Sequence, residues 1–424
     1  MDRALQDRLI AVRRDLHRHP EAGWTEFFAT VRVLEALEEA GIPFVWGRAL
    51  HSPEHMLGLP DDAVLESAWQ RAREATGRED LLLPMRGGFT GCLAEISGAL
   101  PGKTTVFRVD LDACELEECG ADDHLPAREG FASIYPGCMH ACGHDAHTAI
   151  GLGLARLLWA QRDRLSGRVK ILFQPAEEGL RGAASMVQAG LLKDCDRLIG
   201  LHVGIKDLQV GTVAAGCRDF LSSTKLDVIF HGKAAHAGIC PEQGRNALAA
   251  GARATLELLD LPNQFQGLCR VNVGTFHAGS GRNVIPARAH LALETRADTP
   301  ERNGELQNRA EAVCREAAKA YGCGLELRRM GGAGGADSDE VLVERVIAVL
   351  NSLPQVKTVL PTVSFGGGED VTTMMQAVQA QGGQATELLL GMPLIAPHHS
   401  DRFDLPEEII PLGVEVLAAL AMEL

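Results

Sequence analysis

The sequence has no uninterrupted apolar run of the roughly 18 residues that a membrane-spanning helix needs, so we expect no transmembrane segment. The N-terminal stretch MDRALQDRLIAVRRDL mixes acids with bases and has no apolar core. We therefore expect no secretory signal. The chain also has no internal repeat and no low-complexity tract.

The chain also lacks an excess of basic residues. Lys and Arg number 41 against 56 Asp and Glu, which gives a formal net charge of −15. Nucleic acids and anionic lipid surfaces require a basic face, so we expect neither as a partner. The 11 cysteines are an odd number and cannot all be paired. This favours a reducing compartment, and we predict a cytoplasmic location.

The length and composition are those of an ordinary globular enzyme-sized protein. The chain has 424 residues, of which 46% are hydrophobic and 23% charged, enough for two to three domains of about 150 residues. Apolar strand-like stretches alternate with helix-like periodicity over the first half and again near the C-terminus. This alternation predicts an α/β fold with a mostly parallel sheet covered by helices on both faces. The expected strands are 90–96, 103–113, 168–174, 196–204 and 386–392.

The pattern changes in the middle of the chain. Residues 216–331 follow the order strand, helix, strand, strand, helix, strand, which is typical of a ferredoxin-like α+β unit. The simplest organisation is a discontinuous catalytic domain, residues 1–215 and 332–424, with this smaller domain inserted. Residues 47–88 carry turn signals around one polar helical stretch, and we predict that they form an inserted flap.

The histidine-rich stretch MHACGHDAH, residues 139–147, is the sharpest chemical signal. Cys142 and His144 are one residue apart at the expected start of a helix, and thiolate and imidazole both bind zinc-like metals. The alternative for this stretch is a polar loop with a buried cysteine and surface histidines.

Three further polar clusters also follow predicted strands. Glu177 and Glu178 come after an apolar strand, where one carboxylate could bind a metal and the other act as a general base. The alternative for this pair is an acidic first turn favoured by a helix dipole. His202 closes another strand, and His399 follows the strand near the C-terminus. Taken singly, either histidine is as well explained by a structural role.

The shared placement changes the interpretation, because ligands bind beyond the carboxyl ends of strands in open α/β sheets. Cys142, His144, Glu178, His202 and His399 would then supply five ligands. Five ligands exceed what one tetrahedral zinc requires and suit a two-metal hydrolytic site.

The sequence resembles the metal-dependent amidohydrolases and peptidases related to carboxypeptidase G, aminoacylase and hippurate hydrolase. Within that family it is similar to the subgroup with a Cys-Gly-His metal motif. The matching segments run in family order over nearly the whole chain: RRDLHRHPEAGWTE, FRVDLDA, MHACGHDAHT, FQPAEEG, GLHVG, HGKAAHAG, GSGRNVIP, GGGED and HHSDRFD.

The resemblance implies roles for individual residues. Cys142 would bridge two divalent metals, manganese or zinc, and the other four candidates would complete the ligand set. Glu177 matches the general base, and Asp112 matches an acid that steadies the site. His236 resembles a histidine that reaches the partner subunit's active site and polarises the scissile carbonyl. Asn283 and Arg296 resemble groups that hold the substrate carboxylate, for which an Arg fork is suited.

The resemblance also implies an activity. We expect metal-dependent hydrolysis of the amide bond of an N-acyl amino acid, with p-aminobenzoyl-glutamate as the foremost substrate. The alternatives are another aryl- or indole-acyl conjugate, such as indole-acetyl-aspartate, and a non-catalytic binding partner. The inserted domain would act as a lid and dimerisation domain, in a homodimer or in a heterodimer with a related B subunit.

Overall fold

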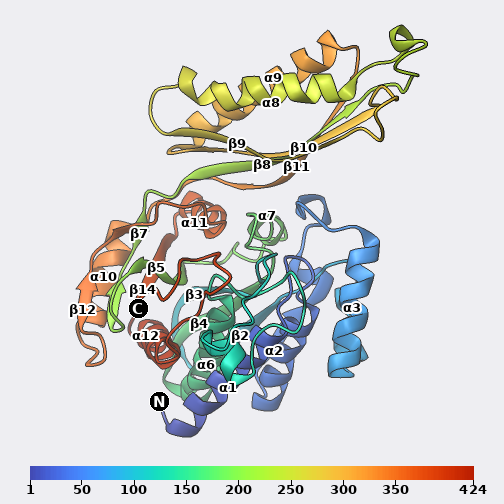
Figure 1. Cartoon of the computed structure of the whole chain (residues 1–424). Coiled ribbons are helices and arrows are strands. Elements are labelled where there is room, and N and C mark those ends of the chain that lie inside the picture. The colour runs from blue at the N-terminus through green and yellow to red at the C-terminus, as the bar shows by residue number, and fades with distance from the viewer. The chain divides into compact units, whose positions relative to one another are not determined.

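The computed structural model describes residues 1–424, which fold into two compact units (Figure 1). The larger unit contains Met1–Arg218, Ala336–Phe365 and Asp370–Leu424, and the smaller unit contains Asp219–Gly335 and Gly366–Glu369. No helix combines the length and the apolar character that crossing a membrane requires.

The larger unit is built on an eight-stranded sheet with the order β1-β2-β4-β3-β5-β14-β6-β12. Its centre, from β4 to β14, is parallel, whereas β1, β2 and β6 pair in antiparallel fashion. The sequence predicts a mostly parallel sheet, and the observed sheet is mixed. One reason is that only residues 98–99 separate β2 from β3, so the chain reverses direction there. The strands of this unit are β1 Phe44–Trp46, β2 Cys92–Ser97, β3 Leu100–Asp110, β4 Ser166–Gln174, β5 Arg197–Asp207, β6 Thr212–Ala214, β7 Cys217–Arg218, β12 Thr358–Leu360, β13 Val363–Ser364 and β14 Gln384–Met392.

Helices cover both faces of the sheet, because successive strand residues point to opposite sides. Phe107 and Val109 of β3 belong to the main core with α1, α2, α6, α10 and α12, whereas Val106 packs in a second core with α7 and α11. The helices of this unit are α1 Arg3–Arg18, α2 Phe27–Ala40, α3 Asp62–Thr76, α4 Glu79–Leu82, α5 Leu125–Glu129, α6 His144–Gln161, α7 Ala183–Gln188, α10 Glu340–Leu350, α11 Val371–Ala380 and α12 Ile409–Glu423.

Residues 47–88, for which the sequence predicts a flap, form a largely helical segment between β1 and β2. Its longest helix, α3, buries Leu65, Ala68, Trp69 and Ala72 and packs on α2. The indole N–H of Trp69 also donates to the carbonyl oxygen of Leu82 at 3.1 Å. The segment is thus a packed part of the larger unit.

The smaller unit is a four-stranded antiparallel sheet with the order β11-β8-β10-β9. Two helices connect the strands in the order β-α-β-β-α-β and share one core with one face of the sheet. Burial alternates strictly along β10, so the opposite face is polar. The elements are β8 Ser222–His231, α8 Ala247–Asp260, β9 Cys269–Ala278, β10 Arg288–Ala297, α9 Pro300–Ala320 and β11 Gly324–Ala333.

Candidate metal centre

The candidate ligands gather at the carboxyl ends of the parallel strands in the larger unit. Asp112 follows β3, Glu177 and Glu178 follow β4, and His399 follows β14. His202 differs from the prediction, because β5 continues beyond it to Asp207 and so His202 lies inside the strand. Parallel neighbours end at the same edge of a sheet, which brings these distant segments together.

Cys142 and His144 flank Gly143 at the start of α6. Gly143 has φ +92°, and a Cβ there would lie 2.5 Å from a methyl group of Val203, so only glycine fits. The Nδ1 atom of His144 lies 2.9 Å from the carbonyl oxygen of Asp112, which places its proton on that side. Its Nε2 is buried without a partner. A buried lone pair of this kind fits a metal ligand.

His202 is held in the same manner. Its Nδ1 lies 2.8 Å from the carbonyl oxygen of Val203, and its Nε2 lies 3.5 Å from the Sγ atom of Cys142. Burial holds the pKa of His202 well below its usual value, which keeps the ring neutral. A neutral imidazole with a free Nε2 lone pair is the form that binds metals.

Glu178 and His399 form the exposed side of the cluster. The Nε2 atom of His399 lies 3.0 Å from Oε1 of Glu178. Burial raises the pKa of Glu178, but His399 and His144 outweigh it and lower this pKa to about 2. His399 has φ +60°, a conformation that non-glycine residues rarely adopt and that is enriched at functional sites. Its N–H donates to the carbonyl oxygen of Ala141, which ties this loop to the Cys142 loop.

Asp112 organises the turn that carries both glutamates. Its two carboxylate oxygens accept the backbone N–H groups of Glu177, at 3.1 Å, and of Glu178, at 2.8 Å. The preceding N–H, of Ala176, donates to the buried carboxylate of Glu26 at 2.7 Å. Both carboxylates therefore fix the turn, and the side chain of Glu177 is 6% exposed.

Other residues of the histidine-rich stretch have structural roles. Nδ1 of His147 lies 2.6 Å from Asp110, and its Nε2 accepts the N–H of Val203 at 3.1 Å, so neither nitrogen remains for a metal. Beneath the site, Arg108 joins Asp110 to Asp370 with distances of 2.9 and 3.0 Å. This buried network supports the ends of β3 and β4.

Sequence reasoning missed three residues that the structure brings to the site: Glu26, Asp110 and Cys114. Two signals in the sequence point to them. Asp110, Asp112 and Cys114 alternate in one segment, and Glu26 closes the motif HRHPEAGWTE. Alternate residues of an extended strand share a face, so Asp110 and Cys114 accompany Asp112.

The residues present fit a divalent metal centre. Three groups have ligand atoms within 4.8 Å of one another: Cys142, His144 and His202; His144, Glu177 and Glu178; and Cys114, Glu178 and His399. They share His144 and Glu178, so they form one continuous cluster. Its thiol, imidazole and carboxylate groups are the donors that zinc takes, and the unpartnered Nε2 of His144 lies among them.

A pocket of about 480 Å³ lies beside this cluster in the larger unit. It is connected to the cluster through Arg181, whose Nε donates to the carbonyl oxygen of Glu178 at 2.8 Å. Segment 47–88 supplies much of the wall, with Pro60, Asp61, Val64 and Arg71. The remaining lining residues are Pro20, Glu21, Ala22, Gly23, Thr25, Glu115, Tyr135, Pro136, Gly137 and Cys138.

The remaining predicted residues belong to the smaller unit. His236 and Asn283 lie on paired loops, where His236 bridges to Val284 and the N–H of Ala237 donates to the carbonyl oxygen of Asn283. The Nδ1 atom of His236 accepts the N–H groups of Gly238 and Ile239, which leaves its Nε2 exposed.

Arg296 lies towards the far end of β10 from these loops. From Arg288 it is eight residues along the strand, a distance of about 27 Å. One chain therefore does not bring Arg296 beside Asn283.

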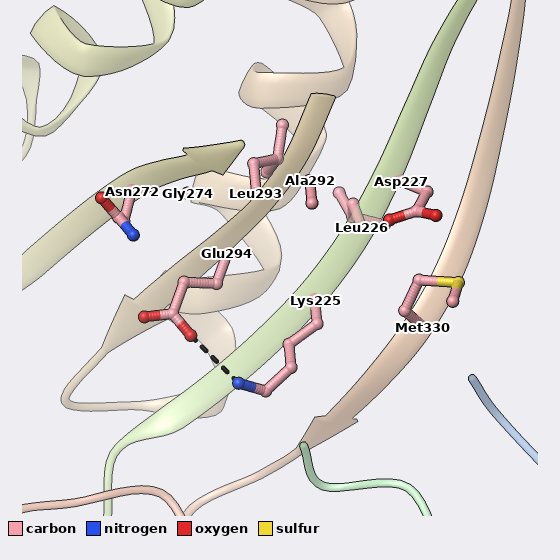
Figure 2. Close-up of a pocket in the computed structure, with 9 residues that line it drawn as sticks. All are labelled: Lys225, Leu226, Asp227, Asn272, Gly274, Ala292, Leu293, Glu294 and Met330. Carbon is pink, nitrogen blue, oxygen red and sulfur yellow. Dashed lines mark hydrogen bonds and ion pairs between the residues drawn. The ribbon is translucent and has the colours of Figure 1, made fainter. Parts of the chain in front are cut away.

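The carboxylate of Glu294 lies between two cations on the polar face of the smaller unit. Nε and Nη2 of Arg296 donate to Glu294 at 2.8 and 3.0 Å. Figure 2 shows Lys225 of β8 reaching the same carboxylate, at 3.2 Å. The two cations and one anion line neighbouring pockets with Asn272, and the trio carries one net positive charge.

Sequence comparisons give close relatives over nearly the full chain. The chain is 43% identical over 421 residues to indole-3-acetyl-aspartic acid hydrolase of Enterobacter agglomerans, covering 99% of this chain and 96% of the relative. It is 41% identical over 420 residues to the first of the named subunits of p-aminobenzoyl-glutamate hydrolase from Escherichia coli K12, with the same coverage.

Solved structures agree with these relatives. An aminobenzoyl-glutamate utilization protein from Klebsiella pneumoniae has a TM-score of 0.85 and 38% identity, covering 99% of this chain and 96% of that chain. A Bacillus subtilis protein described as a dinuclear metal binding peptidase has a TM-score of 0.68 and 26% identity, covering 99% and 98%. The model of peptidase family M20/M25/M40 matches residues 106–423, and the chain belongs to this family.

Proposed function

We propose that this protein hydrolyses the amide bond of an N-acyl amino acid whose acyl group is aromatic, with p-aminobenzoyl-glutamate as the foremost substrate. The observation that carries the proposal is the cluster of thiol, imidazole and carboxylate donors around Glu177 at the sheet edge. The names of the relatives support the substrate class, since both describe an aromatic acyl group joined to an acidic amino acid.

Two divalent ions, zinc or manganese, fit the donor set. Cys142 would be shared between them, with His144, Glu178, His202 and His399 as the other ligands. Divalent ions in such a site polarise the amide carbonyl and lower the pKa of water. The structural relative described as dinuclear supports the number of ions.

Glu177 is the proposed general base. Asp112 fixes its backbone through a hydrogen bond of 3.1 Å, while its carboxylate lies within 4.8 Å of the ligand atoms of His144 and Glu178. Glu177 takes a proton from the attacking water and delivers it to the leaving nitrogen, so one carboxylate serves both half-reactions. His236, through its exposed Nε2, stabilises the negative charge on the amide oxygen in the partner subunit's site.

The pocket beside the cluster is the proposed site for the acyl group. Its volume of about 480 Å³ lies within the range of small-molecule sites. Pro60, Val64 and Tyr135 give it apolar walls. Asp61 and Glu115 add acceptors for the amine or ring N–H that an aminobenzoyl or indole group carries.

Asn283 and Arg296 are the proposed groups for the substrate's carboxylates. The pair formed by Lys225 and Arg296 exceeds the single charge of Glu294, so this face of the smaller unit keeps one positive charge for an anion. Because the two sites lie at opposite ends of β10, they serve the active sites of different subunits in a dimer.

The smaller unit also carries the proposed dimer interface. Helix α8 exposes Leu248, Leu256 and Leu259, with Leu256 73% exposed. On the neighbouring strand β9, at the edge of the sheet, Phe276 is 37% exposed. An apolar helix beside an unpaired strand edge suits a second copy of the chain or a related B subunit. Two relatives are named as one subunit of a hydrolase, which supports the second arrangement.

The test is product analysis of the purified chain, alone and with any B subunit, supplied with manganese or zinc. We expect release of p-aminobenzoate and glutamate from p-aminobenzoyl-glutamate. Faster hydrolysis of indole-acetyl-aspartate would assign the alternative substrate. Inactivity towards a full panel of N-acyl amino acids, despite bound metal, would establish a non-catalytic binding protein instead.

A further inference from the structure

Cys114 lies on the same side of an extended segment as two residues of the metal centre. Asp110, Asp112 and Cys114 alternate after the core of β3, and all three are buried. Asp110 contacts His147, and Asp112 holds the turn of Glu177 and Glu178. The third position of this series therefore faces the same cluster.

The backbone fixes the thiol of Cys114 in place. Its N–H donates to the carbonyl oxygen of Met139 at 2.9 Å, and its carbonyl accepts the N–H of Met139 at 3.1 Å. This pair of hydrogen bonds joins the segment of Cys114 to the loop that carries Cys142. The position of the sulfur is thus set by the same loop that sets the Cys142 thiol.

The sulfur of Cys114 points at two candidate ligands. Its thiol donates to Oε1 of Glu178 at 3.1 Å, and the same oxygen lies 3.0 Å from Nε2 of His399. All three ligand atoms lie within 4.8 Å of one another. Thiol, imidazole and carboxylate at these separations make three corners of a metal coordination sphere.

We propose that Cys114 is a sixth protein ligand of the centre, and that the second thiolate makes this chain prefer zinc to manganese. The inference rests on the proposed metal-dependent function and names a ligand outside the five taken from the family resemblance. When the metal binds, the S–H bond breaks, a sulfur–metal bond forms, and the proton leaves to water. Thiolates favour zinc, whereas manganese prefers carboxylate and water oxygens.

The competing explanation is that Cys114 stays a neutral thiol that only orients Glu178. The two explanations differ in sulfur count, in released protons and in metal preference. Cys114→Ser separates them, because serine keeps a hydrogen-bond donor of similar size but loses the soft thiolate. Cys138→Ser is the matched control, since Cys138 is half-buried nearby but absent from every ligand group.

The first measurement uses the full-length protein loaded with Co²⁺, whose sulfur charge-transfer absorption reports thiolate ligands. We expect Cys114→Ser to lose a large part of this absorption, with Cys138→Ser unchanged. Calorimetry of zinc binding in buffers of different ionisation heat should show one fewer proton released by Cys114→Ser. Its zinc affinity should fall at least about tenfold, and its manganese affinity should fall less.

X-ray absorption on the zinc-loaded wild type needs no variant and covers the case of a misfolded one. Cys142 alone, shared between two ions, gives each zinc one sulfur at about 2.3 Å. Cys114 raises the average by about half a sulfur per zinc. The proposal is overturned if the sulfur count, the Co²⁺ absorption and the proton release all match a centre with Cys142 alone. Failure of the wild type to bind any metal would instead overturn the proposed function, and this inference with it.

Discussion

The Nδ1 atom of His144 lies 2.9 Å from the carbonyl oxygen of Asp112 and 3.3 Å from one of its carboxylate oxygens. Asp112 thereby turns the Nε2 lone pair of His144 towards the cluster while its carboxylate holds the turn of Glu177 and Glu178. One side chain orients three functional residues, from β3, β4 and α6.

Asp112→Asn tests this dependence. An asparagine offers one oxygen where the aspartate accepts two N–H groups, so one N–H of the turn loses its partner. We expect metal affinity to fall by about 10- to 100-fold, together with kcat, in metal titrations and rate assays. Asp163→Asn, on the exposed end of α6, is the control. Wild-type metal affinity in Asp112→Asn would remove Asp112 from this role.

Glu177→Gln separates proton transfer from metal binding. The amide cannot accept the proton of the attacking water, so we expect kcat to fall by about 10²- to 10⁴-fold with full metal content. Glu178→Gln is the comparison, because loss of a ligand should lower metal content itself. Elemental analysis and rate assays check both variants. Near-normal turnover in Glu177→Gln would show that another group is the base.

Val64→Trp tests the acyl pocket. Val64 lines the pocket and is 52% exposed, so an indole there fills space without disturbing the core. We expect kcat/KM for p-aminobenzoyl-glutamate to fall at least about tenfold, as loss of ring contacts implies, with little change for N-acetyl-glutamate. Ala63→Trp, exposed on the adjacent position, is the control. An equal effect on both substrates would place the acyl group elsewhere.

Glu21 predicts a pH dependence of stability. Burial raises the pKa of Glu21 to about 8 from 4.5. Between these values the folded state holds a proton that the unfolded state releases, so stability falls as pH rises through this range. The slope for one proton is at most about 1.4 kcal/mol per pH unit. We expect Glu21→Gln to gain stability relative to wild type from pH 5 to pH 8, measured by unfolding with chelator present. An identical pH profile for both proteins would contradict this.

The apolar surface of α8 predicts an oligomer. Leu256→Glu places a charge on the most exposed large apolar side chain of this helix. We expect the variant to sediment as a monomer, whereas wild type sediments as a dimer with itself or with a B subunit. Val341→Glu, on α10 with 59% exposure, should leave the assembly intact. A monomeric wild type in both settings would refute the interface.

Local patterns were strong enough to predict much of the fold. Helix 145–165 and strand 168–174 were predicted from apolar periodicity, and α6 and β4 occupy these positions. The antiparallel β2 and β6 were not predicted, because sheet neighbours are chosen by long-range pairing that periodicity does not encode. The end of β5 was also placed too early, since a histidine inside a strand resembles one that ends it.

The sequence by itself determined the family and the types of ligand, because motif order and residue chemistry are local properties. Only the tertiary structure decided which groups meet. It places both nitrogens of His147 in structural hydrogen bonds, turns Nε2 of His144 into the cluster, and directs the thiol of Cys114 at Glu178. The physical reason is that strands β3, β4, β5 and β14 are distant in the chain and adjacent in the sheet. Which atoms face one another at their carboxyl ends depends on sheet order and register, and neither is a property of any single segment.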